Sequence, residues 1–226
     1  MRTKKIYLIR HGQTEYNKLG LVQGSGVDAD LNELGKKQAR AFYNAYKHIK
    51  FDKIYTSTLK RTHQTVLPFI NEGVMWQPLE GLNEISWGNK EGKEITDKDN
   101  EQHYFMLHGR KKGELHLKPE GGESPLEVAG RQQKALEHIL QHEQEETILI
   151  CMHGRAMRIF LCLLTDVHIK EMDRFEHNNV SLYVLNYENG KFSIEVSNDR
   201  SHLDSLPASG ASHHSHNTVH YPKVAV

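Results

Sequence analysis

The chain of 226 residues is poor in cysteine and carries no net charge. Two cysteines cannot build a disulfide framework, and their scarcity predicts a reducing, cytoplasmic location. The 29 basic and 29 acidic residues cancel, which argues against nucleic acid or an anionic membrane as a partner, because both attract basic surfaces. The longest apolar run, Ile159–Leu164, is far shorter than the roughly 20 residues of a membrane helix. The run Ile6–Ile9 is also shorter than the roughly 7–15 apolar residues of a signal peptide.

Two common phosphate-handling motifs are missing as well. The chain has no glycine-rich loop followed by Lys and Ser or Thr, so the nucleotide-cradling P-loop is unsupported. A thiolate phosphatase needs an Arg six positions after its Cys, but Met157 follows Cys151 and His168 follows Cys162 at that spacing. We therefore interpret both cysteines as small buried hydrophobes.

Hydrophobic periodicity predicts strands that alternate with helices. The expected strands are 6–9, 53–56, 74–78 and 147–152, the expected helices are 31–49, 58–70, 125–142 and 155–164, and a hairpin joins 180–185 to 192–196. The strands are short and apolar throughout, which is typical of strands buried on both faces. This order predicts an α/β fold with a mostly parallel sheet and a late antiparallel addition.

Capping residues mark three of the helix starts. Asp30 and Glu33 are spaced as a capping box, and Ser57 is expected to cap the helix over 58–70. Ser124 precedes Pro125 and lies three residues before Glu127, which is a strong helix start.

Two of the predicted strands end in the same dipeptide, His-Gly. Arg10 and His11 follow the first strand, and His153 follows the fourth. In open α/β sheets, ligands bind outside the carboxyl ends of the strands, and a glycine there allows close backbone approach. The second strand ends at Ser57, with Arg61 one turn into the next helix. A single His-Gly is more often a turn than a site, but two of them with two arginines favour a site.

Two arginines and two histidines at one edge describe an anion site. Guanidinium groups match phosphate oxygens, and helix N-termini add N–H donors. A neutral imidazole is also a competent nucleophile, provided that a hydrogen bond fixes its tautomer. The pattern therefore favours phosphoryl transfer through a phosphohistidine.

These residues resemble the histidine phosphatase superfamily, also called the phosphoglycerate mutase-like family, over about residues 4–203. The matching residues are Arg10-His11-Gly12-Gln13-Thr14 with Asn17, Gln23-Gly24, Asp28, Leu31 to Ala39, Thr56-Ser57 with Arg61 and Gln64-Thr65, Leu82 and Glu84, Gly88, Glu91-Gly92, Gly122-Glu123-Ser124, His153-Gly154, Asn178 or Asn179, and Asn198-Asp199 with His202-Leu203. The resemblance implies a three-layer sandwich with a mostly parallel central sheet flanked by helices.

The resemblance also implies roles for the matching side chains. His11 would be the phosphorylated nucleophile, and Glu84 would be the general acid and then the general base. From the residues alone, Glu84 is either functional or simply at the surface. Binding of the phosphoryl oxygens is implied for Arg10, Arg61, His153 and Asn17, and Gln23, Gly24 and Gly154 belong to the same substrate-binding set. The implied chemistry requires no metal and no cofactor, and the expected partner is a small phosphorylated substrate.

The chain departs from the family pattern near the substrate. Leu21 stands where many relatives carry Arg, Asp30-Leu31-Asn32 replaces the usual Pro-Leu-Thr, and residues 85–90 differ from the characteristic mutase stretch. We therefore predict a phosphatase acting on a small phosphorylated metabolite. The alternative is a 2,3-bisphosphoglycerate-dependent phosphoglycerate mutase. A non-catalytic phosphate-binding module is least favoured, because His11, Arg61 and Glu84 are all present.

The expected organisation is one catalytic domain over residues 1–203 and a flexible, histidine-containing tail over 204–226. A polar insertion at about 90–120, with one helix at about 95–107, is predicted to form a lid over the site. Its basic run, Arg110, Lys111 and Lys112, would either meet a second anionic group of the substrate or form a solvated turn.

Overall fold

The computed structural model describes residues 3–94, 106 and 108–206. In that part of the chain, six strands form one sheet in the order β3-β2-β4-β1-β5-β6. Their bounds are β1 Thr3–Arg10, β2 Lys53–Thr56, β3 Trp76–Pro78, β4 Thr147–Met152, β5 Leu182–Glu188 and β6 Lys191–Asp199. Strands β3, β2, β4 and β1 are mutually parallel, and β5 and β6 add an antiparallel edge.

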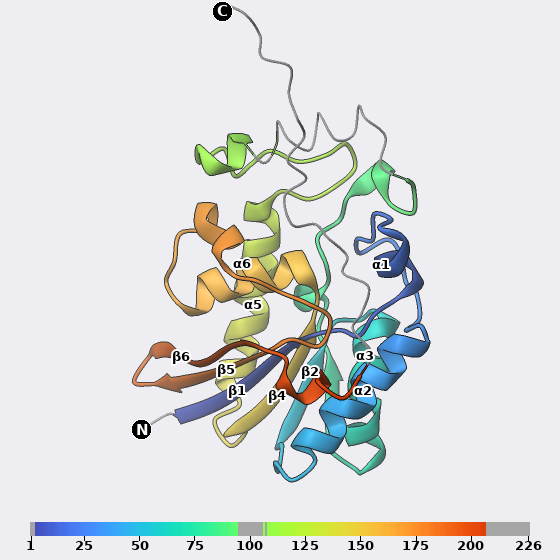
Figure 1. Cartoon of the computed structure of the whole chain (residues 1–226). Coiled ribbons are helices and arrows are strands. Elements are labelled where there is room, and N and C mark those ends of the chain that lie inside the picture. The colour runs from blue at the N-terminus through green and yellow to red at the C-terminus, as the bar shows by residue number, and fades with distance from the viewer. Residues whose placement is uncertain (1–2, 95–105, 107, 207–226) are drawn as a thin grey trace, which may run out of the picture.

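Helices cover both faces of this sheet (Figure 1). Their bounds are α1 Glu15–Leu19, α2 Glu33–Tyr46, α3 Lys60–Asn71, α5 Pro125–Gln141 and α6 Gly154–Leu164. Helices α5 and α6 lie on one face, and α2 and α3 lie on the other. The predicted three-layer α/β sandwich with a mostly parallel central sheet is confirmed.

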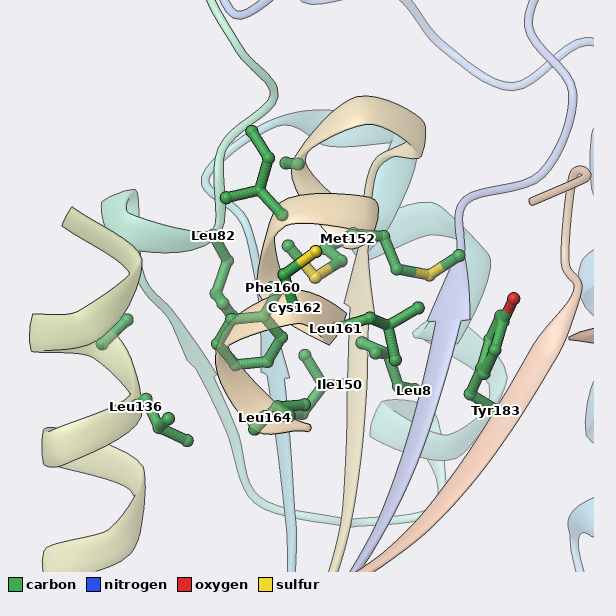
Figure 2. Close-up of a cluster of buried hydrophobic side chains, with 14 of the residues drawn as sticks. Leu8, Leu82, Leu136, Ile150, Met152, Phe160, Leu161, Cys162, Leu164 and Tyr183 are labelled. Carbon is green, nitrogen blue, oxygen red and sulfur yellow. The ribbon is translucent and has the colours of Figure 1, made fainter. Parts of the chain in front are cut away.

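Each face of the sheet contributes alternate strand residues to a separate core. Leu8 and Ile150 pack under Phe160 and Leu161 of α6 (Figure 2). On the opposite face, Ile9, Leu149 and Ile54 pack with side chains of α2 and α3. The central strands are therefore buried on both sides, which explains their uninterrupted apolar sequence.

Two predicted helix starts are wrong in detail. Helix α2 begins at Glu33, and the N-cap is Asn32, whose side chain accepts from the Gly35 N–H at 2.9 Å. Asp30 does not cap this helix, because its carboxylate accepts from the Gln64 amide at 2.7 Å. The intrinsic preference of Asp for an N-cap was outweighed by this tertiary contact.

Helix α3 begins at Lys60, and its N-cap residue, Leu59, makes no side-chain cap. Ser57 was predicted as the cap, but its hydroxyl accepts from the Leu59 N–H and also binds His153. The capping box of Ser124 and Glu127 at the start of α5 is confirmed.

Several further expectations can be compared with the described residues. Helix α1 was not predicted, since five residues are too few to show periodicity. Both cysteines are unpaired and buried, as predicted. The predicted helix at 95–107 falls, apart from Met106, outside the described residues, as do residues 207–226 of the predicted tail. No helix in the described part of the chain is long and apolar enough to cross a membrane.

Candidate active site

Three neighbouring parallel strands deliver the predicted site residues to one edge of the sheet. Arg10, the last residue of β1, pairs with Met152, the last residue of β4, so His11 and His153 follow at equivalent positions. Their ring centroids are 5.1 Å apart. Strand β2 lies on the other side of β4 and is followed by Ser57. The structure thus brings both histidines together at the carboxyl edge, where ligands of such sheets bind.

The tautomer of His11 follows from the hydrogen bond that its imidazole ring makes to Gly12. His11 Nδ1 lies 2.7 Å from the Gly12 carbonyl oxygen. A carbonyl oxygen only accepts, so Nδ1 carries the proton and Nε2 keeps a free lone pair. Burial, together with the charges of Arg61 and Arg10, holds the pKa of His11 well below its usual range. His11 is therefore a neutral imidazole at neutral pH, with an unprotonated Nε2.

His153 has the opposite tautomer. Arg61 Nε donates to His153 Nδ1 at 3.1 Å, so Nδ1 has no proton and Nε2 does. That Nε2–H donates to the Ser57 hydroxyl oxygen at 2.7 Å. Burial and the charge of Arg61 also hold the pKa of His153 well below its usual range. One histidine thus offers a lone pair and the other offers an N–H donor, and their ring centroids are close together.

Arg61 is fully buried and is held by the loop before α2 as well as by His153. Its Nη1 donates to the Val27 carbonyl at 2.6 Å, and its Nη2 donates to the Gly24 carbonyl at 3.1 Å. Burial lowers the pKa of Arg61 to about 10, which leaves it charged at neutral pH. A Cβ at Gly24 would lie 2.7 Å from the Ile85 carbonyl oxygen, so the close packing of this loop against the backbone requires glycine.

His177 is a site residue that sequence reasoning missed. Arg10 Nη1 lies 3.2 Å from His177 Nδ1, and because guanidinium only donates, this nitrogen is the acceptor. The His177 ring also packs on Gly154, where an added Cβ would lie 2.8 Å from His177 Cε1. Burial, then Arg10, lowers the pKa of His177 well below its usual range. Its only sequence signal is its place before Asn178 and Asn179.

A chain of amide side chains connects the first loop to the last. Asn179 Nδ2 donates to the His11 carbonyl at 3.0 Å and to Asn17 Oδ1 at 3.1 Å. Asn17 Nδ2 in turn donates to Gln23 Oε1 at 3.2 Å. The sequence left open whether Asn178 or Asn179 matters, and the structure gives this contact to Asn179. The Gln23 Nε2 group is buried and has no hydrogen-bond partner among the described residues.

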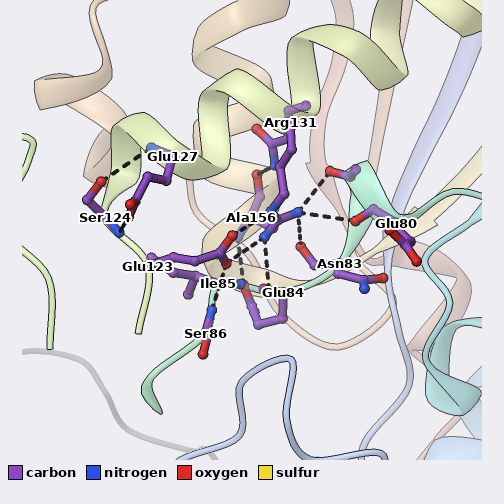
Figure 3. A network of polar contacts seen from close by, with 12 residues as sticks. Glu80, Asn83, Glu84, Ile85, Ser86, Glu123, Ser124, Glu127, Arg131 and Ala156 are labelled. Atoms are coloured by element: carbon purple, nitrogen blue, oxygen red, sulfur yellow. Dashed lines mark hydrogen bonds and ion pairs between the residues drawn. The ribbon is translucent and has the colours of Figure 1, made fainter. Parts of the chain in front are cut away.

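Glu84 reaches the site from the loop after β3 and lies against the first turn of α6 (Figure 3). It is only 7% exposed. Its Oε1 accepts from the backbone N–H of Ile85 at 2.9 Å and of Ala156 at 2.8 Å. Its Oε2 accepts only from the Arg155 N–H, at 3.1 Å. Oε2 therefore has more remaining hydrogen-bonding capacity than Oε1.

Arg131 on α5 fixes the loop that carries Glu84, and it is a further residue that no sequence motif predicted (Figure 3). Its Nη1 donates to the carbonyls of Gly81 and Asn83, and its Nη2 donates to the carbonyl of Glu84 at 3.0 Å. The guanidinium also pairs with both carboxylate oxygens of Glu123, at 2.9 and 3.0 Å. Glu123 precedes Ser124, the N-cap of α5, so no helical spacing in the sequence indicates its pairing with Arg131.

The site holds two buried guanidinium groups, neutral imidazoles and one carboxylate. This inventory suits a phosphoryl group, since Arg10 and Arg61 supply charge and His153 supplies a donor. Within the described residues, no group of three or more His, Cys, Asp or Glu side chains is arranged to hold a metal ion.

A family model decides the family to which this arrangement belongs. The model of the histidine phosphatase superfamily (branch 1) matches residues 6–200. The chain belongs to this superfamily.

Two curated relatives of this histidine phosphatase have activities in their names. Phosphoserine phosphatase 1 of Hydrogenobacter thermophilus is 29% identical over 203 residues, covering 88% of this chain and 94% of that protein. The metal-independent phosphoserine phosphatase of Arabidopsis thaliana is 30% identical over 208 residues, covering 89% and 84%. The solved structure named Mycobacterial hydrolase 1 shares the fold, with a TM-score of 0.79 at 23% identity, covering 88% of this chain and all of that one.

These findings confirm the resemblance and the prediction of a histidine phosphatase-type phosphomonoesterase. The roles of individual residues stay predictions. The basic run in the insertion is divided by the structure, since Arg110 is buried whereas Lys111 and Lys112 are exposed. The solvated-turn alternative therefore describes the two lysines and does not describe Arg110.

Proposed function

We propose that this phosphatase hydrolyses monophosphate esters of small metabolites through a phosphohistidine on His11. The observation that carries the proposal is the His11 tautomer, because the Nδ1–H bond to Gly12 leaves Nε2 as an unprotonated nucleophile. In the first step, the Nε2 lone pair forms a bond to phosphorus, and the bond from phosphorus to the ester oxygen breaks. The leaving oxygen takes a proton, and the phosphoryl group stays on His11.

Free donors around His11 support the binding of the phosphoryl oxygens. In the described part of the chain, Arg10 Nε and Gln23 Nε2 are buried without hydrogen-bond partners, and His153 Nε2–H bonds only to a hydroxyl that a phosphate oxygen would replace. Arg10 and Arg61 remain charged at neutral pH and stabilise the negative charge as it spreads over the oxygens. In this proposal Gly24 acts through Arg61 and Gly154 acts through His177, while Asn17 orients Gln23.

We assign the proton transfers to Glu84 Oε2. A protonated Glu84 gives its proton to the leaving oxygen in the first step. The resulting carboxylate then accepts a proton from water as the water oxygen attacks phosphorus and the bond from Nε2 to phosphorus breaks. Inorganic phosphate leaves, and both His11 and the Glu84 carboxyl group return to their starting states.

The relatives and the sequence support the proposed substrate class and the proposed location. The name phosphoserine phosphatase, carried by the two relatives, supports a small phosphorylated metabolite as substrate. The family match over 6–200 supports the predicted catalytic domain of residues 1–203. Two unpaired thiols support a reducing, cytoplasmic location.

The decisive experiment traps the covalent intermediate. The wild-type protein, mixed with p-nitrophenyl phosphate and quenched within milliseconds, should carry an acid-labile, alkali-stable phosphate on His11. His11→Ala should abolish both the label and turnover, whereas a conservative change at an exposed histidine, His48→Gln, should leave both intact. Turnover by His11→Ala at the wild-type rate would refute the mechanism. Interconversion of 3- and 2-phosphoglycerate far faster than hydrolysis would identify the alternative, a mutase.

A further inference from the structure

The segment between His177 and β5 contains a residue in an unfavourable backbone conformation. Val180 has a φ of 57°, in the left-handed region, and its side chain is fully buried. A side chain that branches at Cβ is crowded by the backbone in this region, so glycine or asparagine is the usual occupant. Such a conformation persists only where the surrounding structure holds it, and such conformations gather at functional sites.

Val180 differs in this respect from the other residues with a positive φ. Among the described residues other than glycine, these are Asp166, Asn189 and Asn198. Asp and Asn adopt the left-handed conformation readily, because their short polar side chains can bond to the local backbone. Valine has no such compensation. The contacts around Val180 must therefore supply what its own side chain does not.

Two hydrogen bonds hold the backbone of Val180 in this conformation. Its N–H donates to the carbonyl oxygen of Arg10, the residue before the proposed nucleophile, at 3.0 Å. Its carbonyl oxygen lies 3.0 Å from His202 Nε2. Because a carbonyl oxygen only accepts, Nε2 carries the proton and donates it. The first bond connects Val180 to the reaction centre, and the second connects it to a histidine that the proposed mechanism does not use.

The ring of His202 is itself fixed by packing. The residue lies in the short helical turn Ser201–Leu203, which follows β6. Its ring packs edge-on against Phe42 and Tyr46 of α2, with centroid separations of 5.4 and 5.7 Å. Within the described part of the chain, Nδ1 is buried without a hydrogen-bond partner. The bond to the Val180 carbonyl is therefore the polar contact that a substitution of His202 would remove.

Val180 passes this constraint to Asn179, its neighbour in sequence. Asn179 Nδ2 donates to the His11 carbonyl at 3.0 Å. On the other side of Val180, the Ser181 N–H donates to the Asn178 carbonyl at 3.1 Å, which closes a tight turn around the two residues between them. A rotation of the Val180 backbone out of the left-handed region would therefore move Asn179 away from His11.

We infer that His202 is a positioning residue for the reaction at His11. It holds Val180 in the left-handed conformation, and through Val180 it holds Asn179 on the His11 carbonyl. Without the His202 bond, the protein should still bind phosphate but should phosphorylate His11 slowly. This inference rests on the proposed function, because it takes His11 as the nucleophile.

The test replaces His202 with a side chain that keeps a ring but has no donor. His202→Phe retains packing on α2 and removes the bond to Val180. In rapid-quench experiments with p-nitrophenyl phosphate, we expect the phosphorylation rate of His11 to fall by about 10- to 100-fold, since a misplacement of about 1 Å can have an effect of that size. Inhibition by inorganic phosphate should change much less, because the guanidinium group of Arg61 is held by other contacts.

A conservative variant should restore the rate. In His202→Gln, the side-chain amide can place an N–H where the imidazole Nε2–H was, so most of the phosphorylation rate should return. If His202→Phe does not fold, as judged by circular dichroism, His202→Asn takes its place. The shorter Asn amide does not reach the Val180 carbonyl, so the comparison with His202→Gln stays the same.

A second-site variant distinguishes positioning from stability. Val180→Gly removes the side chain that makes the left-handed conformation unfavourable, so this backbone no longer depends on His202. Adding Val180→Gly to His202→Phe should therefore recover much of the lost rate, even though removal of a buried valine lowers the Tm further. Phe51→Leu is the control, because Phe51 belongs to the same hydrophobic core as Val180. It should lower the Tm without slowing the phosphorylation of His11.

The outcomes separate this inference from the proposed function. A folded His202→Phe protein that phosphorylates His11 at the wild-type rate would overturn the inference and leave the proposed function standing. The inference would also be overturned if neither His202→Gln nor the double variant with Val180→Gly were faster than His202→Phe. An equal slowing in Phe51→Leu would overturn it too, because a general loss of stability would then explain the effect. Failure of the wild-type protein to form the phosphoenzyme would instead count against the proposed function.

Discussion

Replacing Arg131 with Met tests whether the α5 guanidinium positions the proposed acid/base residue. Arg131 binds both oxygens of Glu123 and the carbonyls of Gly81, Asn83 and Glu84, all at 2.8 to 3.0 Å. Arg131→Met keeps much of the aliphatic packing but removes every one of these bonds. We therefore expect two effects, a loss of stability and a displaced Glu84.

The size of the stability effect follows from the contacts. A hydrogen bond to a charged group contributes about 1.5–3 kcal/mol when well formed. The Arg131 side chain is 22% exposed, so water replaces part of what is lost. We expect a decrease of about 3 kcal/mol in the free energy of unfolding, at the lower end of the cost of breaking a buried pair. In a domain of this size, that is a fall of about 6–12 °C in Tm.

The assay combines urea unfolding with steady-state kinetics at a temperature where the variant is folded. We expect kcat to fall by about tenfold, because a displaced general acid–base group needs to raise the activation free energy by only about 1.4 kcal/mol to have that effect. Inhibition by inorganic phosphate should change much less, because the anion-binding residues come from other elements. Arg131→Lys should recover little, because an ammonium group cannot reproduce the guanidinium fork.

Lys134→Met, an exposed change one turn later on α5, is the control and should alter neither quantity. A folded Arg131→Met enzyme with wild-type kcat would refute the positioning argument. A decrease of less than about 1 kcal/mol in the free energy of unfolding would refute the expected stability loss, because all the Arg131 contacts together would then contribute less than one hydrogen bond to a charged group.

Three further predictions concern the histidines. Folding lowers the pKa values of His11, His153 and His177 below 6.5, so below that pH the unfolded chain binds more protons than the folded protein does. The free energy of unfolding should therefore decrease as the pH falls from 6.5. In urea titrations at several pH values, His177→Asn should make this decrease smaller. Gly154→Ala places a Cβ 2.8 Å from the His177 ring and should reduce kcat/KM by about tenfold or more. Wild-type kinetics in this variant would contradict the prediction. Ser57→Ala removes the acceptor for His153 Nε2–H and should destabilise the free enzyme by about 1 kcal/mol. Because bound phosphate replaces that acceptor, adding phosphate should raise the Tm of the variant more than the Tm of the wild type.

The sheet and the large helices could be predicted because their signals are local. Uninterrupted apolar runs such as Ile6–Ile9 identify buried strands, and Ser124 with Glu127 identifies the start of α5. Helix starts that depend on distant partners could not be predicted. Asp30 is a residue type that often caps helices, but its carboxylate accepts a hydrogen bond from Gln64, which lies far along the chain.

The same division applies to the site. The sequence was enough to predict that the residues at the ends of the strands lie close together, because parallel strands present their carboxyl ends at one edge of the sheet. His177 and Arg131 have no such rule, since their contacts depend on how a late loop and a helix pack on the sheet. Nothing in the sequence Arg110-Lys111-Lys112 indicates that the first is buried and the others are not.

The spacing between strands β1 and β4 sets the distance between the two histidines. His11 and His153 follow paired residues of adjacent strands, and their 5.1 Å ring separation is close to the strand spacing of about 4.8 Å. No side-chain rearrangement is needed to set it, and fraying of a surface loop does not change it. Heat inactivation should therefore coincide with melting of the sheet and should not precede it. The same origin makes the site intolerant of length changes, because deleting one residue within β4 would reverse the face to which each following side chain points.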